Sequence, residues 1–163
     1  MFDDVLAGNN EFSSKFKDKA LTGLAVKGLA IITCIDSRID PLGLTGMAAG
    51  DAKILRNAGA RVTDDVLRTL ILATHLLGVS RVLVAPHTDC KMATGDENSF
   101  HQEIFKKSGV DTRSIEIRTV DNQETTLRQD LLRIKTSPFL PRELVVVGAI
   151  YDVKTGKLKE ITD

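Results

Sequence analysis

The stretch Leu29–Cys34, which reads LAIITC, decides the fold class of this chain. Its apolar side chains, rich in β-branched residues, predict a short strand that is buried on both faces, as in a parallel sheet. Sheets of this kind bind their ligands beyond the carboxyl ends of the strands. The predicted strand ends at Cys34, so a thiol stands where a parallel sheet builds its functional site.

Runs of similar character alternate with helical patterns along the rest of the chain. Further strands are predicted at 52–59 (AKILRNAG), 81–87 (RVLVAPH), 143–153 (ELVVVGAIYDV) and 154–161 (KTGKLKEI), with a less regular one at 113–120 (RSIEIRTV), and helices at 63–78, 99–107 and 123–137. Thr63 is expected to cap the first of these helices. The alternation predicts a single α/β domain over residues 1–163, with a mostly parallel β-sheet flanked by helices. Right-handed crossovers predict helices on both faces of the sheet.

Composition argues against several classes of function. Lysine and arginine total 22, as do aspartate and glutamate, so no net charge favours nucleic acid or a membrane surface as partner. No apolar run is long enough to span a membrane, and the N-terminus lacks the apolar core of a secretory signal. Two cysteines do not make a disulfide scaffold, so a cytoplasmic location is expected. Residues 1–20 are polar and weakly helical, and we interpret them as an arm that needs something to pack on.

Both cysteines of the chain lie at or just beyond the carboxyl ends of predicted strands. Cys34 ends the first strand, and His87 ends the strand at 81–87 and is followed by Cys90. Two thiolates and one imidazole are a ligand set typical of zinc, and three protein ligands leave a fourth position for water. The residues therefore favour a catalytic zinc site, provided that the two strands lie close together.

Asp36 and Arg38 follow Cys34 at every second position. If the chain stays extended, period-2 alternation puts all three side chains on one face. A carboxylate two residues from a metal ligand can reach the metal or accept a hydrogen bond from its water, and Arg38 can hold Asp36 off the metal in a bidentate pair. The alternatives are that each cysteine is a small buried hydrophobe and that Asp36 and Arg38 form an ordinary local ion pair.

These motifs resemble those of one known family. CIDSRID (34–40) is similar to the Cys-x-Asp-x-Arg motif of β-class carbonic anhydrases, and HTDC (87–90) is similar to their His-x-x-Cys motif. RNAGARVTDDVLRTL (56–70) and GAIYDVKTGKLKEI (148–161) resemble the short bacterial and archaeal branch of that family. The resemblance covers most of the chain, is densest from Leu29 to Met92 and is weak from Ala93 to Pro138.

The resemblance implies one Zn²⁺ per chain with Cys34, His87 and Cys90 as ligands, and Asp36 and Arg38 as a catalytic dyad. It implies reversible hydration of carbon dioxide to bicarbonate and a proton, by attack of zinc-bound hydroxide. In an open arrangement water is the fourth ligand, and in a closed one Asp36 itself ligates zinc. The resemblance also implies a homodimer or a dimer of dimers, in which residues 1–20 serve as a dimerisation arm or remain a simple surface helix.

Some positions need separate expectations. Lys91 stands where the family usually has glycine. Its side chain is expected to narrow the substrate pocket or to add positive potential there, with the alternative that it points to solvent. Ala58 and Gly59 are candidate pocket-lining residues, with a tight exit from the strand as the alternative. His75 and His101 are candidate proton shuttles, although such histidines more often pack or sit at the surface.

Two other functions stay open. The same zinc site can act on carbonyl sulfide or carbon disulfide in close relatives, and pocket access would distinguish the two substrate classes. A reading from a different class is a non-catalytic zinc-stabilised dimer, or a thiol-based redox module that pairs Cys34 with Cys90.

Overall fold

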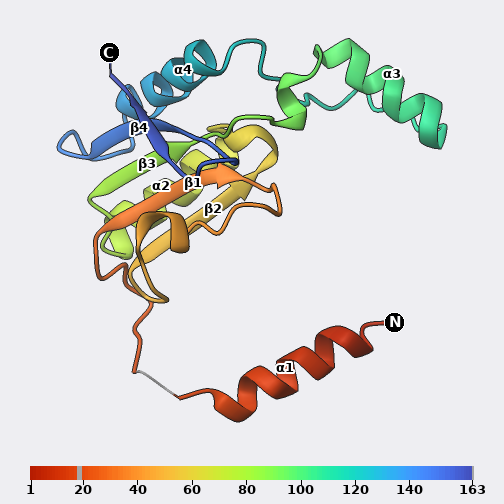
Figure 1. The fold of residues 1–163 in the computed structure, drawn as a ribbon. Helices are drawn as coiled ribbons and strands as arrows, with labels where there is room; N and C mark the ends of the chain where they lie inside the picture. The colour runs from red at the N-terminus through yellow and green to blue at the C-terminus, as the bar shows by residue number, and fades with distance from the viewer. Residues whose placement is uncertain (18–19, 163) are drawn as a thin grey trace.

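The computed structural model describes residues 1–17 and 20–162. Its elements in chain order are α1 (Asp3–Lys15), β1 (Leu29–Cys34), η1 (Gly43–Thr45), β2 (Ala52–Asn57), η2 (Ala58–Ala60), α2 (Asp64–Leu76), β3 (Arg81–Ala85), η3 (Lys91–Ala93), α3 (Glu97–Ser108), α4 (Gln123–Lys135), β4 (Val145–Tyr151) and β5 (Leu158–Ile161) (Figure 1). Within the described ranges, no helix is long and apolar enough to cross a membrane.

The strands form one five-stranded sheet in the order β2-β1-β3-β4-β5. β1 runs parallel to β2 and β3, β4 runs parallel to β3, and β5 closes the edge antiparallel to β4. The predicted α/β fold with a mostly parallel sheet is confirmed. Every residue of β1 is buried, as its apolar run predicts for a central strand. Because β1 and β3 are neighbours, the residues that follow them emerge at the same edge of the sheet.

Helices α2 and α4 pack on the same face of the sheet. One row of paired residues crosses the three central strands, namely Ile32 in β1, Val84 in β3 and Gly148 in β4. The face of the sheet to which this row belongs is covered by a single apolar cluster that contains residues of both helices. A Cβ on Gly148 would lie only 2.7 Å from Leu131 of α4. The expectation of helices on both faces is therefore wrong. The β1–β2 crossover, which would supply a helix to the other face, contains only the short turn η1.

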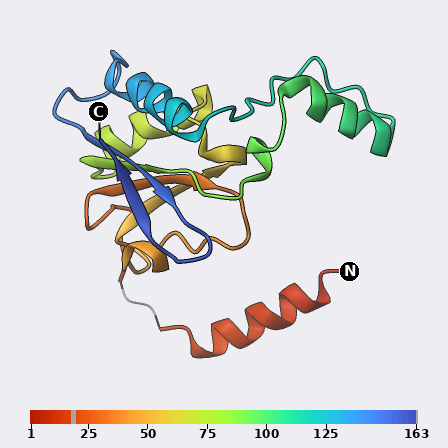
Figure 2. The same cartoon turned by 45° about the horizontal axis from the view of Figure 1, so that its top comes forward.

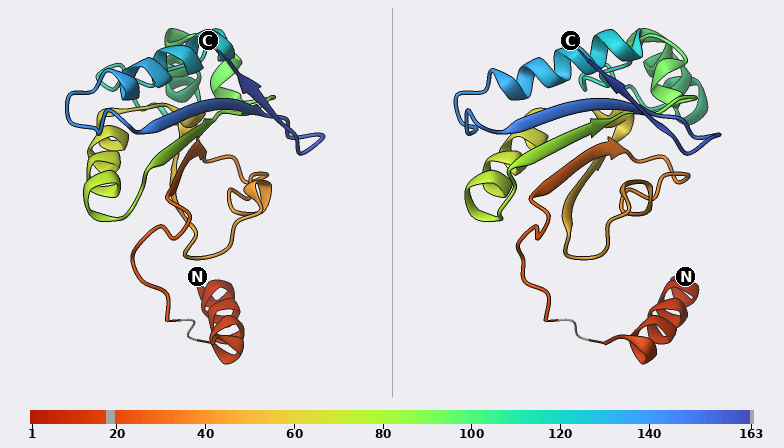
Figure 3. Two further views of the ribbon diagram at one scale, coloured as in Figure 1. Left: turned by 90° about the vertical axis from the view of Figure 1, so that its left-hand side faces the viewer. Right: turned by 60° about the vertical axis from the view of Figure 1, so that its left-hand side comes forward.

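The other face of the sheet is covered in part by the segment between β1 and β2. Leu44 and Met47 of that segment line a groove together with Leu29, Leu83 and Val147 of the sheet. Helix α1 lies apart from this body of the molecule in every view (Figures 2 and 3). None of its residues is buried.

Two further expectations concern local structure. Thr63 does cap α2, because its side chain accepts a hydrogen bond from the backbone N–H of Val66. The strand predicted at 113–120 is absent. The backbone N–H groups of Ile117 and Arg118 donate to the carboxylate of Glu97 in α3, so a side chain takes the donors that a strand partner would have used.

Candidate metal centre

The residues predicted as metal ligands come together at the edge of the sheet. The ligand atoms of Cys34, His87 and Cys90 all lie within 4.8 Å of one another, and the three residues are buried. Cys34 ends β1, while His87 and Cys90 belong to the loop after β3, so the pairing of these two strands brings the three residues together. The two cysteines are 56 positions apart in sequence, and the parallel pairing of β1 with β3 brings them together.

The two ring nitrogens of His87 have different surroundings. Its Nδ1 contacts the backbone oxygen of Thr88 at 2.8 Å, and the side chain of Gln123 donates to the backbone oxygen of His87. Among the described residues, His87 Nε2 is the buried side-chain nitrogen or oxygen that has no hydrogen-bond partner. Such an atom costs free energy unless a ligand uses it. With Nδ1 engaged on a carbonyl, the neutral ring presents a lone pair at Nε2, as in metal-bound histidines.

The two sulfur atoms fit a zinc ion equally well. Cys34 Sγ and Cys90 Sγ lie 4.0 Å apart, and both cysteines are free. Tetrahedral coordination with Zn–S bonds of about 2.3 Å separates two sulfurs by about 3.8 Å. A disulfide would need about 2.05 Å between the sulfurs. The spacing therefore matches a shared ion and excludes a bond between the cysteines in this arrangement.

The site favours negative charge on Cys34. A hydrogen bond from the Cys90 thiol, with contacts from His87 and from the backbone N–H of Gly59, lowers the pKa of Cys34 against the opposing effect of burial. The same hydrogen bond and burial raise the pKa of Cys90. Cys34 is thus the thiol that ionises more readily of the two, and a divalent cation would favour loss of the proton from both sulfurs.

Asp36 and Arg38 form an ion pair beside this cluster. Arg38 Nε donates to Asp36 Oδ1 at 2.9 Å and Arg38 Nη2 donates to Asp36 Oδ2 at 2.8 Å. These hydrogen bonds, with one from the backbone N–H of Arg38, hold the pKa of Asp36 well below its usual range. Asp36 Oδ2 lies 3.8 Å from His87 Nε2. An ionised carboxylate therefore borders the unpartnered nitrogen while its own oxygens stay bound to the guanidinium.

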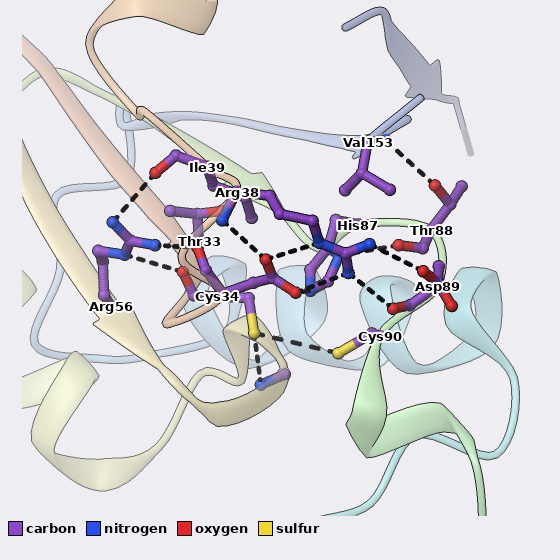
Figure 4. A network of polar contacts seen from close by, with 12 residues as sticks. Thr33, Cys34, Arg38, Ile39, Arg56, His87, Thr88, Asp89, Cys90 and Val153 are labelled. Atoms are coloured by element: carbon purple, nitrogen blue, oxygen red, sulfur yellow. Dashed lines mark hydrogen bonds and ion pairs between the residues drawn. The ribbon is translucent and has the colours of Figure 1, made fainter. Parts of the chain in front are cut away.

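Sequence reasoning missed two residues that shape this site. Arg56 at the end of β2 donates to the backbone oxygens of Cys34 at 2.8 Å, Asp36 at 2.6 Å and Ile39 at 3.2 Å. Arg38 also contacts Asp89 of the HTDC motif (Figure 4). The position of Arg56 beside the predicted end of a strand was the available signal, but it did not reveal which loop the side chain would reach.

The pocket candidates occupy different surroundings. The side chain of Lys91 turns to α3, where its Nζ donates to Glu103 at 3.1 Å. Gly59 makes a tight turn at the exit of β2 with a φ of +78°, and Ala58 lines a surface depression with Asn57 and Arg61. None of these observations tests a role in substrate binding, which stays a prediction.

The two candidate proton shuttles have partners outside the cluster. His75 Nε2 contacts the backbone oxygen of Phe139 at 3.0 Å. His101 is buried and its Nδ1 contacts Thr112 Oγ1 at 2.9 Å. Neither contact leads to the metal ligands, so the geometry supplies no support for proton transfer through them.

Residues 29–158 match the family model described as carbonic anhydrase. The chain belongs to the β-class carbonic anhydrase family. It is 38% identical to β-carbonic anhydrase 1 of Mycobacterium tuberculosis over 98% of this chain and 97% of that protein. The crystal structure of a carbonic anhydrase from Streptococcus mutans superposes with a TM-score of 0.93 at 36% identity, covering 99% of this chain and 97% of the other. A carbon disulfide hydrolase of Saccharolobus solfataricus is 30% identical over 81% of this chain and 76% of its own length.

β-Class carbonic anhydrases are zinc enzymes, and the Cys34–His87–Cys90 group of this member can hold a metal ion. The fit rests on the donor set, the sulfur spacing and the unpartnered nitrogen of His87.

Proposed function

We propose that this protein catalyses the reversible hydration of carbon dioxide to bicarbonate and a proton, with one zinc ion per chain held by Cys34, His87 and Cys90. One observation carries the proposal. His87 Nε2 is buried and has no hydrogen-bond partner among the residues that the structure describes. It lies beside the two cysteine sulfurs and 3.8 Å from the Asp36 carboxylate. Membership of the β-class family supports the same reaction.

When bound, zinc supplies a Lewis acid that makes water a nucleophile at neutral pH. The chain contributes the orientation. Asp36 is ionised, so its carboxylate can only accept hydrogen bonds. It would orient the attacking water by accepting a hydrogen bond from it. Arg38 keeps Asp36 ionised and donates hydrogen bonds to both of its oxygens. These hydrogen bonds would keep the carboxylate from coordinating the metal, as in the open arrangement. The closed arrangement would require these hydrogen bonds to break.

Carbon dioxide is small and has no net charge, so its site needs little beyond space and a few polar groups. We propose that the backbone at Ala58 and Gly59 borders that space, since Gly59 touches Cys34 through its N–H. Lys91 would contribute only through its backbone, because its side chain is engaged with Glu103 on α3.

Metal analysis and a stopped-flow hydration assay on the same preparation test the proposal. Asp36→Asn is expected to keep its zinc and to lose at least about 100-fold in kcat/KM. Asp40→Asn, a change of another carboxylate on the same loop, is the matched control and should retain wild-type activity. Zinc-loaded wild-type protein that does not hydrate carbon dioxide anywhere between about pH 6 and about pH 9 would refute the proposal.

The second candidate is hydrolysis of carbon disulfide or carbonyl sulfide. The carbon disulfide hydrolase among the relatives favours it, although its identity to this chain is lower than that of the β-carbonic anhydrases. A sulfide-release assay run beside the hydration assay separates the two reactions. Sulfide release with negligible bicarbonate formation would favour the hydrolase.

We also propose that residues 1–20 are an arm that packs on a second copy of the chain; of these, residues 18–19 lie outside the described residues. Helix α1 buries none of its own side chains. The helix and its two cap residues, Phe2 and Phe16, expose a set of large apolar side chains that also includes Val5, Leu6 and Phe12. Such a set is unusual on a helix with no partner. Phe12→Ser with Phe16→Ser should shift the mass in light scattering from dimer, or dimer of dimers, toward monomer, and an unchanged mass would count against the arm.

A redox role for the two cysteines and a non-catalytic zinc-stabilised dimer are the remaining alternatives. The sulfur separation of 4.0 Å offers the redox role no support. Stoichiometric zinc would exclude it, and a silent Asp36→Asn variant would favour the non-catalytic dimer. The cytoplasm stays the proposed location, since it keeps thiols reduced.

A further inference from the structure

Arg38 has a second acidic partner besides Asp36. Its Nη1 donates to Asp89 Oδ2 at 2.8 Å, and its Nη2 donates to the main-chain oxygen of Asp89 at 3.0 Å. Figure 4 shows Asp89 beside the guanidinium of Arg38. Asp89, which lies between His87 and Cys90, therefore accepts hydrogen bonds from Arg38 with both its side chain and its backbone.

The two aspartates bind different parts of the guanidinium. Asp36 takes Nε and one N–H of Nη2, whereas Asp89 takes Nη1 and the other N–H of Nη2. Arginine offers five N–H donors in a fixed fork, so both sets of bonds form at once without competition for a hydrogen. Asp89 thus adds to the Asp36–Arg38 pair and does not weaken it by withdrawing donors.

Asp89 hydrogen-bonds across from the loop after β3 to the loop after β1. Asp36 and Arg38 belong to one loop after β1, so their pair alone is local and would move as a unit. Arg56 fixes the backbone of that loop through its carbonyl oxygens but contacts neither the Asp36 carboxylate nor the Arg38 side chain. The contact with Asp89 is what ties the Arg38 side chain to the loop that carries His87 and Cys90.

Stability and packing do not account for this contact. The side chain of Arg38 is 44% exposed and that of Asp89 is 67% exposed, and ion pairs between such groups contribute little to folding. Asp89 also adopts a φ of +56°, in the left-handed region that most residues with a Cβ avoid. The residue with this unfavourable backbone conformation is therefore the same one whose side-chain and main-chain oxygens bind Arg38.

We propose that Asp89 is a positioning residue that holds the Arg38 guanidinium in place and so keeps the Asp36 carboxylate in its pair beside His87. Its consequence for turnover rests on the proposed function. The restraint on Arg38 itself does not, because it is a property of the chain with or without substrate.

The variant that isolates the effect is Asp89→Gly, because glycine removes the side-chain acceptor and tolerates a positive φ. Asp89→Asn is the conservative variant, since its side-chain oxygen can still accept from Nη1 and asparagine also tolerates this backbone. Asp111→Gly is the matched control. Asp111 is another carboxylate paired with an arginine, Arg113, in the loop after α3 and away from the metal ligands.

The direct measurement is ¹⁵N NMR relaxation of the Arg38 Nε–H group in zinc-loaded protein. Its order parameter is expected to fall from the rigid range, about 0.8, to below about 0.6 in Asp89→Gly, and to stay near the wild-type value in Asp89→Asn and Asp111→Gly. A merely structural role for Asp89 would leave this group unchanged. Arg38 as ordered in Asp89→Gly as in the wild type would overturn the proposal.

Kinetics give the second measurement. At unchanged zinc content, kcat/KM of Asp89→Gly is expected to fall about tenfold, while Asp89→Asn stays within about threefold of the wild type. Asp89→Gly with wild-type kcat/KM would also count against the role. If the wild type itself does not hydrate carbon dioxide, the proposed function fails and the NMR comparison still decides whether Asp89 restrains Arg38.

Discussion

The backbone N–H of Gly59 donates a hydrogen bond to the sulfur of Cys34 at 3.4 Å. The contact depends on a φ of +78° at Gly59, and an added Cβ would lie 3.3 Å from Met92 and 3.4 Å from Val120. The turn that leaves β2 is therefore also part of the electrostatic environment of a proposed zinc ligand.

Gly59→Ala is expected to destabilise the fold by about 1–2 kcal/mol, because alanine disfavours this backbone conformation, and to weaken zinc binding as the N–H shifts from the sulfur. Urea denaturation and competition with a chelator measure the two effects. Gly156→Ala is the control, since Gly156 has a similar φ of +72° and open space around it. Equal zinc affinity in the two variants would show that the N–H contact does not matter for the metal.

Zinc binding should stabilise the folded chain by mass action. At free zinc about 1,000 times the dissociation constant, the free energy of unfolding is expected to rise by about 4 kcal/mol. Cys90→Ala should lose both the bound zinc and this increment, whereas Mg²⁺ should not stabilise either protein because thiolates are poor ligands for it. Metal analysis and urea denaturation with and without zinc check the prediction. A full zinc increment in Cys90→Ala would remove Cys90 from the ligand set.

The carboxyl group of Asp36 should stay ionised in moderate acid. Because hydrogen bonds from Arg38 depress its pKa in the folded chain, its stabilising contribution is present above the unfolded value of about 3.9 and is lost only as pH falls through the lower folded value. ¹³C NMR of metal-free protein should find Asp36 ionised at about pH 4, where exposed carboxyl groups are about half protonated. Arg38→Ala should return the Asp36 midpoint toward about 4. A wild-type midpoint already near 4 would mean that the pair does not persist in solution.

Arg61, the residue after η2, and Asp130 of α4 form a largely buried ion pair. Arg61 Nε donates to Asp130 Oδ2 at 2.8 Å, and the two side chains are 15% and 7% exposed. Asp130→Ala leaves the guanidinium without its charge partner and is expected to cost about 3–5 kcal/mol in the free energy of unfolding. Asp111→Ala, which breaks an exposed pair, should cost less than about 1 kcal/mol. Similar losses in the two variants, measured by urea denaturation, would contradict the importance of burial here.

Much of the metal centre was predictable because its residues sit at strand ends. The spacing at every second position singled out Cys34, Asp36 and Arg38, and the apolar run 81–85 led to His87 and Cys90. The chain does not stay extended after Cys34, however, because β1 ends there and the backbone turns at Ser37 and Arg38. That these five residues lie together depended on β1 and β3 being neighbours, which the alternation of elements makes plausible but does not require. The two cysteines and the histidine among them then indicated zinc as the metal.

The sequence by itself determined the local elements, the strand ends and the residue types available for zinc, because apolar periodicity and turn residues act over a few positions. Only the tertiary structure decided which distant groups meet there. Arg56 donates hydrogen bonds to carbonyl oxygens of the loop after β1, and Asp89 accepts hydrogen bonds from Arg38. Glu97 accepts hydrogen bonds from backbone N–H groups of the segment predicted as a strand. These contacts join residues about 20 to 51 positions apart, and they depend on strand order and on backbone angles such as the φ of Asp89, which no local pattern specifies.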